Sequence, residues 1–435
     1  MRYRNIAAVA VSTAVVASLV AACSSGGSSS SGGSGGGGGA AGGRGPITVV
    51  QGKDNNNVIP TLTQMWNKDH PNEQVTFKQQ SDSADDQLQD LQQHFQAKDP
   101  NYDVVSVDVI WTAQFAAQGW IEALKGQYAM TNQKDLLPAT LKAATYAGNQ
   151  YAAPSSSDGG MLYFRKDLVP TAPKTWDELI ADCSKAKAQG IDCYAGQYKN
   201  YEGLTCNATE AINTAGGEVV KEDGKTPNVD TPEAKKGLDF LVNGFKQGYI
   251  PKNALSFQEE QSLNDFQSGH LMFLRNWPYA VSLLKTSGSS KVKDKFDIAP
   301  LPGSGSGEHA DQGASTLGGH SWAISVYSKH KATAHDFLAF SESDAVQRYL
   351  LTQATLAPVI SSLYSDQALV AKFPYLPILL KSIQTAVPRP VTPFYPAVTK
   401  AIETNVYAAL QGQKSSDQAL KDLQSAINSA ASGGG

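Results

Sequence analysis

The sequence predicts an α/β fold built from two lobes. Short apolar or alternating segments, typical of strands, recur between segments with helical spacing of apolar residues. A strand–helix–strand–helix–strand order at this spacing is typical of a parallel sheet covered by helices. The alternation is too extensive for one plain sheet, and the 435 residues suffice for two domains, so two α/β lobes explain the pattern most economically.

Residues 1–22 have the composition of an export signal. Two arginines precede an apolar run at 6–20, which is too short to span the membrane in the mature protein. A Val-Ala-Ala-Cys sequence then ends at Cys23, as in a lipobox, where the thiol carries a diacylglycerol; an ordinary secretory signal with a chance cysteine is the alternative. The Ser- and Gly-rich segment up to residue 45 is typical of a flexible tether. We expect 23–45 to anchor the protein by lipid to the extracytoplasmic face of the cell membrane.

The chain after the tether predicts the first three strands, at 47–51, 74–79 and 103–107. Between them lie two predicted helices, one carrying Ile59, Leu62, Met65 and Trp66 at helical spacing and one at 87–97. Parallel sheets bind ligands beyond the carboxyl ends of their strands. Asp54 and Asp108 fall just past two such ends and are therefore candidate ligand-binding residues.

Further strands are predicted at 161–165, 193–196, 271–274, 296–299 and 322–326, and helices at 175–188, around 210, at 232–246, at 259–267 and over most of the chain from 333. Residues 271–274 are expected to form a buried strand, which ends at the turn of Pro278 because a proline cannot continue a central strand, and Trp277 is left at a rim. An exposed indole beside an arginine and an amide is suited to a sugar, which offers a C–H face and hydroxyls. A core tryptophan at a strand end is the alternative.

Charge and cysteine content narrow the function further. The net charge is −4 and the pI about 6.0, so no basic surface for nucleic acid is expected. Cys183 and Cys193 lie ten residues apart in an exported chain, where a disulfide contributes about 2–3 kcal/mol, and Cys206 is left over. No CxxC pair or HExxH motif occurs, so we expect no metal and no other cofactor.

Seven short motifs follow one another along the chain: Asp-Val-Ile-Trp at 108–111, Gly-Trp-Ile at 119–121, Ser-Asp-Gly-Gly at 157–160, Tyr-Glu-Gly-Leu-Thr at 201–205, Arg-Asn-Trp-Pro-Tyr at 275–279, Thr-Leu-Gly-Gly at 316–319 and Arg-Pro-Val-Thr-Pro-Phe-Tyr at 389–395. In this order and spacing they resemble the carbohydrate-binding lipoproteins of ABC importers, closest to the trehalose/maltose-binding branch. The resemblance covers nearly all of the mature chain.

The resemblance implies a type II periplasmic-binding-protein-like fold with three crossings between the lobes, near 153–156, 313–315 and 358–361. The implied N-terminal lobe comprises 46–154 and 314–359, and the C-terminal lobe 155–313 and 360–431. A monomer is expected to capture a sugar and deliver it to ABC permease subunits driven by a separate ATPase, because this chain has no P-loop. The resemblance implies no enzymatic activity.

The resemblance also assigns roles to individual residues. It implies that Asp108 and Asp158 bind sugar hydroxyls, that Trp277 stacks on a sugar ring, that the backbone at Gly318 and Gly319 approaches the ligand, and that Arg389 and Tyr395 complete the pocket. The loop after the first strand is expected to add Asp54 or Asn55, and His320 stands where an aromatic residue is common. Structural alternatives are a helix cap for Asp158, a strand end for Asp108 and a surface ion pair for Arg389.

Three functions remain open at this point. Trehalose is the first expected ligand and maltose-type α-glucosides come next, captured by closure of two hinged lobes. The second possibility is a binder of another solute, such as an amino sugar or an oligosaccharide. The third is a secreted glycoside hydrolase that uses Asp108 and Asp158 as acid and base.

Overall fold

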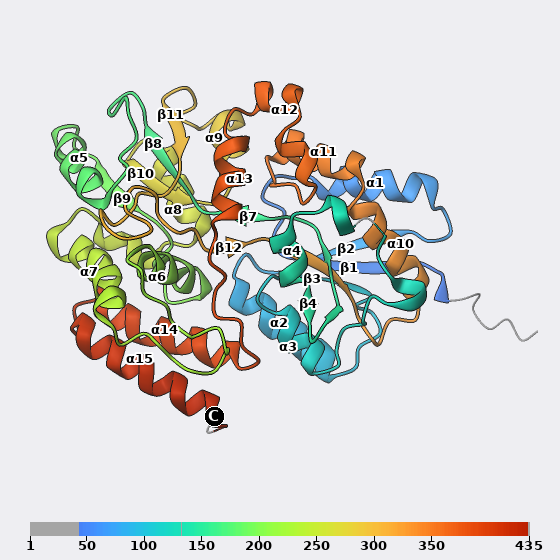
Figure 1. Cartoon of the computed structure of the whole chain (residues 1–435). Helices are drawn as coiled ribbons and strands as arrows, with labels where there is room; N and C mark the ends of the chain where they lie inside the picture. The colour runs from blue at the N-terminus through green and yellow to red at the C-terminus, as the bar shows by residue number, and fades with distance from the viewer. Residues whose placement is uncertain (1–42, 132, 434–435) are drawn as a thin grey trace, which may run out of the picture. The chain divides into compact units, whose positions relative to one another are not determined.

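The computed structural model describes residues 43–131 and 133–433, which contain two main β-sheets, each with its own helices (Figure 1). One sheet has the strand order β2-β1-β3-β13-β6, and the other has the order β11-β8-β10-β9. The predicted signal at 1–22, Cys23 and the tether up to residue 42 lie outside the described residues.

The first sheet consists of β1 (Ile47–Gln51), β2 (Val75–Gln79), β3 (Val104–Asp108), β6 (Ala153–Pro154) and β13 (His320–Ile324). The three N-terminal strands are parallel, as predicted, whereas β13 runs antiparallel to both of its neighbours. This last strand begins two residues before the predicted position, because it continues directly from a turn that enters from the second sheet.

Both faces of the first sheet are covered by apolar side chains. Val50, Val105 and Val107 pack into one hydrophobic cluster, and Val49 and Val104 pack into another, as the period of two in a strand requires. The covering helices are α1 (Ile59–Asp69), α2 (Ala84–Gln96), α3 (Thr112–Ala117), α4 (Pro138–Ala143), α10 (Lys331–Ser341) and α11 (Asp344–Ala354). The carboxyl ends of β1 and β3 are thereby left as the open edge of the sheet.

The second sheet consists of β8 (Met161–Arg165), β9 (Asp192–Ala195), β10 (Leu271–Asn276) and β11 (Phe296–Ala299). One of its two central strands, β10, begins where the buried apolar run was predicted and ends at Asn276, two residues before Pro278, with all six of its residues buried. Arg275 and Asn276 are buried and have protein partners, so they do not form an exposed polar rim, although Arg275 does lie against the indole of Trp277.

Nine helices are associated with the second half of the fold: α5 (Trp176–Ala188), α6 (Glu202–Thr214), α7 (Pro232–Gln247), α8 (Glu259–Gln267), α9 (Ala280–Thr286), α12 (Gln367–Lys372), α13 (Leu376–Gln384), α14 (Tyr395–Leu410) and α15 (Ser416–Ala431). Helix α6 begins eight residues before Glu210, the position at which the sequence indicated a helix, and all thirteen of its residues are buried. Figure 1 shows two of the helices that cover it: α7 and α14 pack against α6, and α15 packs on the far side of α14.

The chain passes between the sheets from β6 to β8 and returns from β11 to β13. At these passages β7 (Asp158–Gly159) pairs antiparallel with β12 (Leu317–Gly318) and forms a two-stranded sheet of its own. A third passage follows α11. The exact lobe boundaries stay a prediction, but the paired strands fix Asp158 directly beside Gly318.

A disulfide and the ion pairs of Arg44 hold peripheral segments of the fold in place. A disulfide joins Cys183 to Cys193, and Cys206 is a free, buried thiol, as the cysteine spacing suggested. Arg44, which the sequence placed in the tether, donates hydrogen bonds to Glu73 (2.8 Å) and Asp336 (2.7 Å), so the tether ends slightly earlier than predicted. Within 43–131 and 133–433, no helix combines the length and apolar character needed to cross a membrane.

Candidate functional site

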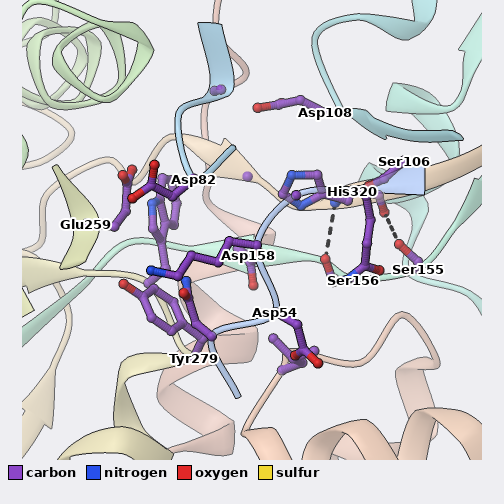
Figure 2. A pocket seen from close by; sticks show the side chains of 18 of the residues that line it. Asp54, Asp82, Ser106, Asp108, Ser155, Ser156, Asp158, Glu259, Tyr279 and His320 are labelled. Carbon is purple, nitrogen blue, oxygen red and sulfur yellow. Dashed lines mark hydrogen bonds between the residues drawn. The ribbon is translucent and has the colours of Figure 1, made fainter. Parts of the chain in front are cut away.

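A cavity of about 310 Å³ lies where the open edges of the two sheets face each other (Figure 2). Its walls come from the loop after β1, the end of β3, the β7 and β12 passages, β13, the starts of α6 and α8, and the turn after β10. Ligand binding beyond the carboxyl ends of parallel strands is the usual arrangement in α/β folds.

An ion-pair network at the cavity wall joins elements of both sheets. Arg389 donates from Nη2 to Asp108 Oδ1 (2.6 Å), at the end of β3, and from Nη1 to Glu202 Oε1 (2.6 Å), at the start of α6. Burial raises the pKa of Glu202, although Arg389 opposes the shift. The Nε of Arg389 is buried without a partner among the described residues. The arginine is therefore not a surface ion pair but a link across the cavity, with one donor to spare.

A second buried arginine supports the predicted stacking residue. Arg275 Nε donates to Glu210 Oε2 (2.7 Å) and Nη1 to Gln197 Oε1 (3.0 Å). Its Cζ lies 3.8 Å from the centroid of the Trp277 ring, as in a cation–π contact. Trp277 itself is half-buried and lines the cavity. The indole is thus held by the protein while part of its surface remains accessible to a ligand.

Asp158 is the carboxylate that the protein leaves open in the centre of the cavity (Figure 2). Its side chain has no hydrogen-bond partner within the described part of the chain, and it does not cap a helix. Burial, together with the charge of Asp108, raises the pKa of Asp158 to about 7. Asn55 Oδ1, also at the cavity, is buried and unpaired in the same described part. Two acceptors are therefore available to hydroxyl donors of a solute.

The other predicted contacts differ in what they offer. Both carboxylate oxygens of Asp54 accept backbone N–H groups at the start of α1, from Val58 (3.1 Å) and Ile59 (2.8 Å), so Asp54 caps a helix although it lines the cavity. Tyr395 is 1% exposed and lies outside the cavity lining, where its hydroxyl donates to Glu202. Tyr395 therefore acts on the cavity through Glu202.

The two glycines also have distinct positions. A Cβ on Gly318 would come within 2.9 Å of Trp277 Cζ3, so the bare backbone there lets the indole pack against β12. Gly319 is not part of the cavity lining; it has φ +114°, and a side chain would collide with the carbonyl of Ser156. Gly319 thus serves the turn into β13.

Several lining residues were not among the ligand-binding residues expected from the sequence. Tyr201 donates to Glu259 (2.7 Å), and Lys53 pairs with Glu260 (2.6 Å) across the two sides of the cavity. With these, the lining holds seven carboxylates and two fixed cations: Asp54, Asp82, Asp108, Asp158, Glu202, Glu259 and Glu260 against Lys53 and Arg389. Such a field disfavours anionic solutes. The acidic residues at the start of α8 are visible in the sequence, but their proximity to residues 53–56 arises only in the folded protein.

His320 lies at the cavity next to the β3 terminus, opposite Asp108 in the pairing of β13 with β3 (Figure 2). Burial lowers the pKa of His320, so the neutral imidazole is favoured. Its backbone N–H donates to Ser156 Oγ (3.2 Å), which ties β13 to the first passage between the sheets. The ring supplies a polar edge where the resemblance would place an aromatic residue.

Comparison with known proteins agrees with this geometry. Residues 32–348 match the bacterial extracellular solute-binding protein family. A probable ABC transporter-binding protein of Deinococcus radiodurans is 32% identical over 373 residues, covering 80% of this chain and 85% of that protein. A mannitol-binding protein of Pseudomonas aeruginosa is 29% identical over 354 residues, covering 74% of this chain and 79% of the relative. The structure of maltose-bound T. maritima MalE3 has a TM-score of 0.83 and 32% identity, covering 88% of this chain and 98% of that one.

The fold and the cavity between its sheets define a two-lobed, periplasmic-binding-protein-like α/β protein. This chain belongs to the bacterial extracellular solute-binding protein family. The family consists of substrate-binding proteins of ABC transporters and not of enzymes.

Proposed function

We propose that this protein captures a neutral sugar or sugar alcohol between its two lobes and delivers it to an ABC permease. The observation that carries the proposal is the half-buried Trp277, held from one side by Arg275, in a cavity that also presents the unpaired acceptors of Asp158 and Asn55. An indole covers the C–H face of a sugar while carboxylate and amide oxygens accept its hydroxyls. The maltose- and mannitol-binding relatives support this chemical class.

Within this class, trehalose or a related α-glucoside disaccharide is our first candidate, on the combined motifs at 108–111, 157–160 and 275–279. A thermal-shift screen with trehalose, maltose, mannitol, an amino sugar and maltotriose tests this choice. A cognate solute at about 1,000 times its dissociation constant adds about 4 kcal/mol of stability. If mannitol or the amino sugar stabilises the protein and the disaccharides do not, the disaccharide assignment is wrong.

Capture is proposed to proceed by closure of the lobes, because the cavity walls come from both sheets. A solute that contacts both walls stabilises the closed arrangement by its differential affinity. Small-angle scattering of the ectodomain should show a smaller radius of gyration at saturating sugar. An unchanged radius with a bound sugar would contradict closure.

The export signal at 1–22 and the cysteine that follows it suggest how the protein is held at the membrane. We propose that Cys23 carries the lipid anchor that keeps the binding domain near its permease. A Cys23→Ser variant, compared with the wild type by fractionation, should move from the membrane fraction to the medium. Retention of this variant at the membrane would favour another mode of attachment.

The alternative function is glycoside hydrolysis, with Asp108 and Asp158 as acid and base. Asp108 is held in an ion pair by Arg389, so it is not a free general base of the kind that a glycosidase pair needs. A reducing-sugar assay with trehalose and maltose should detect no product, and release of glucose would overturn the binding function.

A further inference from the structure

The cavity has an apolar part that the proposed sugar contacts leave unused. Six side chains form it, and we call them the apolar recess: Val58, Ile59 and Leu62 at the start of α1, Val346 and Leu350 in α11, and Leu356 just after α11. None of these side chains carries a donor or an acceptor. This wall therefore offers nothing to replace the water around a sugar hydroxyl.

The recess is distinct from the packed cores. Val58, Leu62 and Val346 are at most 7% exposed, yet none of them belongs to the three hydrophobic clusters found in the described residues. Leu350 and Leu356 are only partly buried. Val346 is 0% exposed and is covered by neighbouring atoms, so the partly buried Ile59, Leu350 and Leu356 are the recess side chains with most accessible surface at the cavity. Ligand pockets commonly combine apolar side chains of this kind with a few polar groups that orient the ligand.

Local hydrogen bonds preform the recess. Asp54 caps the backbone N–H groups of Val58 and Ile59, which fixes the first turn of α1. The hydroxyl of Tyr349, in α11, donates to the carbonyl of Val58 (3.4 Å) and connects the two helices. Both contacts lie within the first half of the fold, so the recess does not require the second sheet to take shape.

We infer that the captured solute carries an apolar substituent, an alkyl or aryl aglycone on the saccharide, and that the apolar recess receives it. This inference rests on the proposed function, since the polar groups around Asp158 and Trp277 hold the sugar in the same cavity. The polar part then fixes the orientation of the ring, and the recess selects for the group attached to it.

Calorimetry with a matched series tests the inference: methyl, butyl and hexyl α-glucosides and α-maltosides, with 6-hydroxyhexyl glycosides as controls of equal length and higher polarity. Burial of each added methylene is expected to tighten binding about fourfold, so the hexyl glycoside should bind at least tenfold more tightly than the methyl glycoside. The terminal hydroxyl should cancel most of this gain.

Two variants in the apolar recess, compared with one at the indole, test the inference further. The two recess variants replace partly exposed residues that tolerate substitution. Leu350→Ser and Leu356→Ser should each lower the ratio of hexyl to methyl affinity severalfold, whereas Trp277→Ala should weaken both ligands and leave the ratio near its wild-type value. If the methyl glycoside binds and the hexyl glycoside binds no more tightly, the aglycone inference fails alone. If no saccharide of either series or of the earlier panel binds, the sugar function and the inference fail together.

Discussion

The site contains two buried arginines, Arg275 and Arg389, whose partners are arranged differently. Arg275 lies inside a strand of the second sheet, and its partners Glu210 and Gln197 belong to the same half of the fold. Arg389 instead joins Asp108 of the first sheet to Glu202 of α6, and its Nε has no partner within 43–131 and 133–433. One arginine is internal to a lobe, and the other bridges two.

This difference teaches which polar groups build the site and which respond to the solute. Because both partners of Arg275 lie in its own half of the fold, we expect this pair to stay buried when the lobes move and to act as a rigid support for Trp277. The Arg389 contacts lie across the cavity and can exchange for water or for sugar hydroxyls when the lobes separate. The following predictions test that division.

The largest expected effect is that of Arg275→Ala on stability. Removal of the guanidinium leaves the Glu210 carboxylate, 5% exposed, without its cation, and such a loss costs about 3–5 kcal/mol. Chemical denaturation should show this loss, together with weaker sugar binding through Trp277. Arg348→Ala is the matched control, because that arginine is 40% exposed and should change stability by less than about 1 kcal/mol. Equal losses in the two variants would remove the special role of Arg275.

Arg389→Ala should act more on closure than on folding. Without the bridging cation, Asp108 and Glu202 repel each other in the closed arrangement, but opening of the lobes rehydrates both. We expect at least tenfold weaker sugar binding and a larger radius of gyration, with a smaller loss of folding stability than in Arg275→Ala. Arg389→Lys keeps the charge but not the fork and should fall in between. A stability loss as large as that of Arg275→Ala would show that both arginines are structural.

The pH dependence of Asp158 gives a third test. Its pKa of about 7 lies above the ordinary value of about 3.9, so between these values the folded protein holds a proton that the unfolded chain has lost. Asp158 therefore lowers stability as pH rises through this window, and Asp158→Asn should be about 1–2 kcal/mol more stable than wild type above pH 7, after allowance for water in the cavity.

Sugar binding should show the opposite trend. Hydroxyl donors favour the ionised carboxylate, so affinity should fall as pH drops below about 7 and level off above about 8. Calorimetry from acidic to alkaline pH measures this, and Asp158→Asn should bind more weakly but with a flatter profile. An unchanged slope in that variant would assign the pH dependence to another group.

The comparison also shows what the sequence could predict. Strands such as 47–51 and 296–299 were located at their exact bounds, because their apolar pattern is local. Helix α6 was predicted around Glu210, which lies within it, but its start was not located, since a helix buried on all sides has no polar face to mark where it begins. Arg275 was expected beside an exposed indole, but its burial could not be read from the sequence, because its partner Glu210 lies 65 residues away.

The residues of the site also differ in how far the sequence could predict them. The resemblance singled out Asp108 and Arg389, whose contact spans 281 residues and leaves no trace in composition or spacing. The cap formed by Asp54 was not predicted, because Asp54 lies five residues before the first helical residue, Ile59, and a cap signal is read from the residue directly before a helix. The apolar recess was not predicted either, since Leu62 has the same helical spacing as the core residue Trp66.

The smallest expected effects come from two tyrosines that support the two arginine regions. Tyr395 donates to Glu202, the partner of Arg389, and Tyr163 donates to the carbonyl of Trp277 (2.6 Å), beside Arg275. Each Tyr→Phe change removes one hydroxyl and should cost about 1 kcal/mol of stability. Only Tyr395→Phe should also weaken sugar binding severalfold and shift scattering toward the open form, because Glu202 then holds Arg389 less firmly across the cavity. If Tyr163→Phe opened the protein to the same extent, the bridging role would not be confined to the Arg389 network.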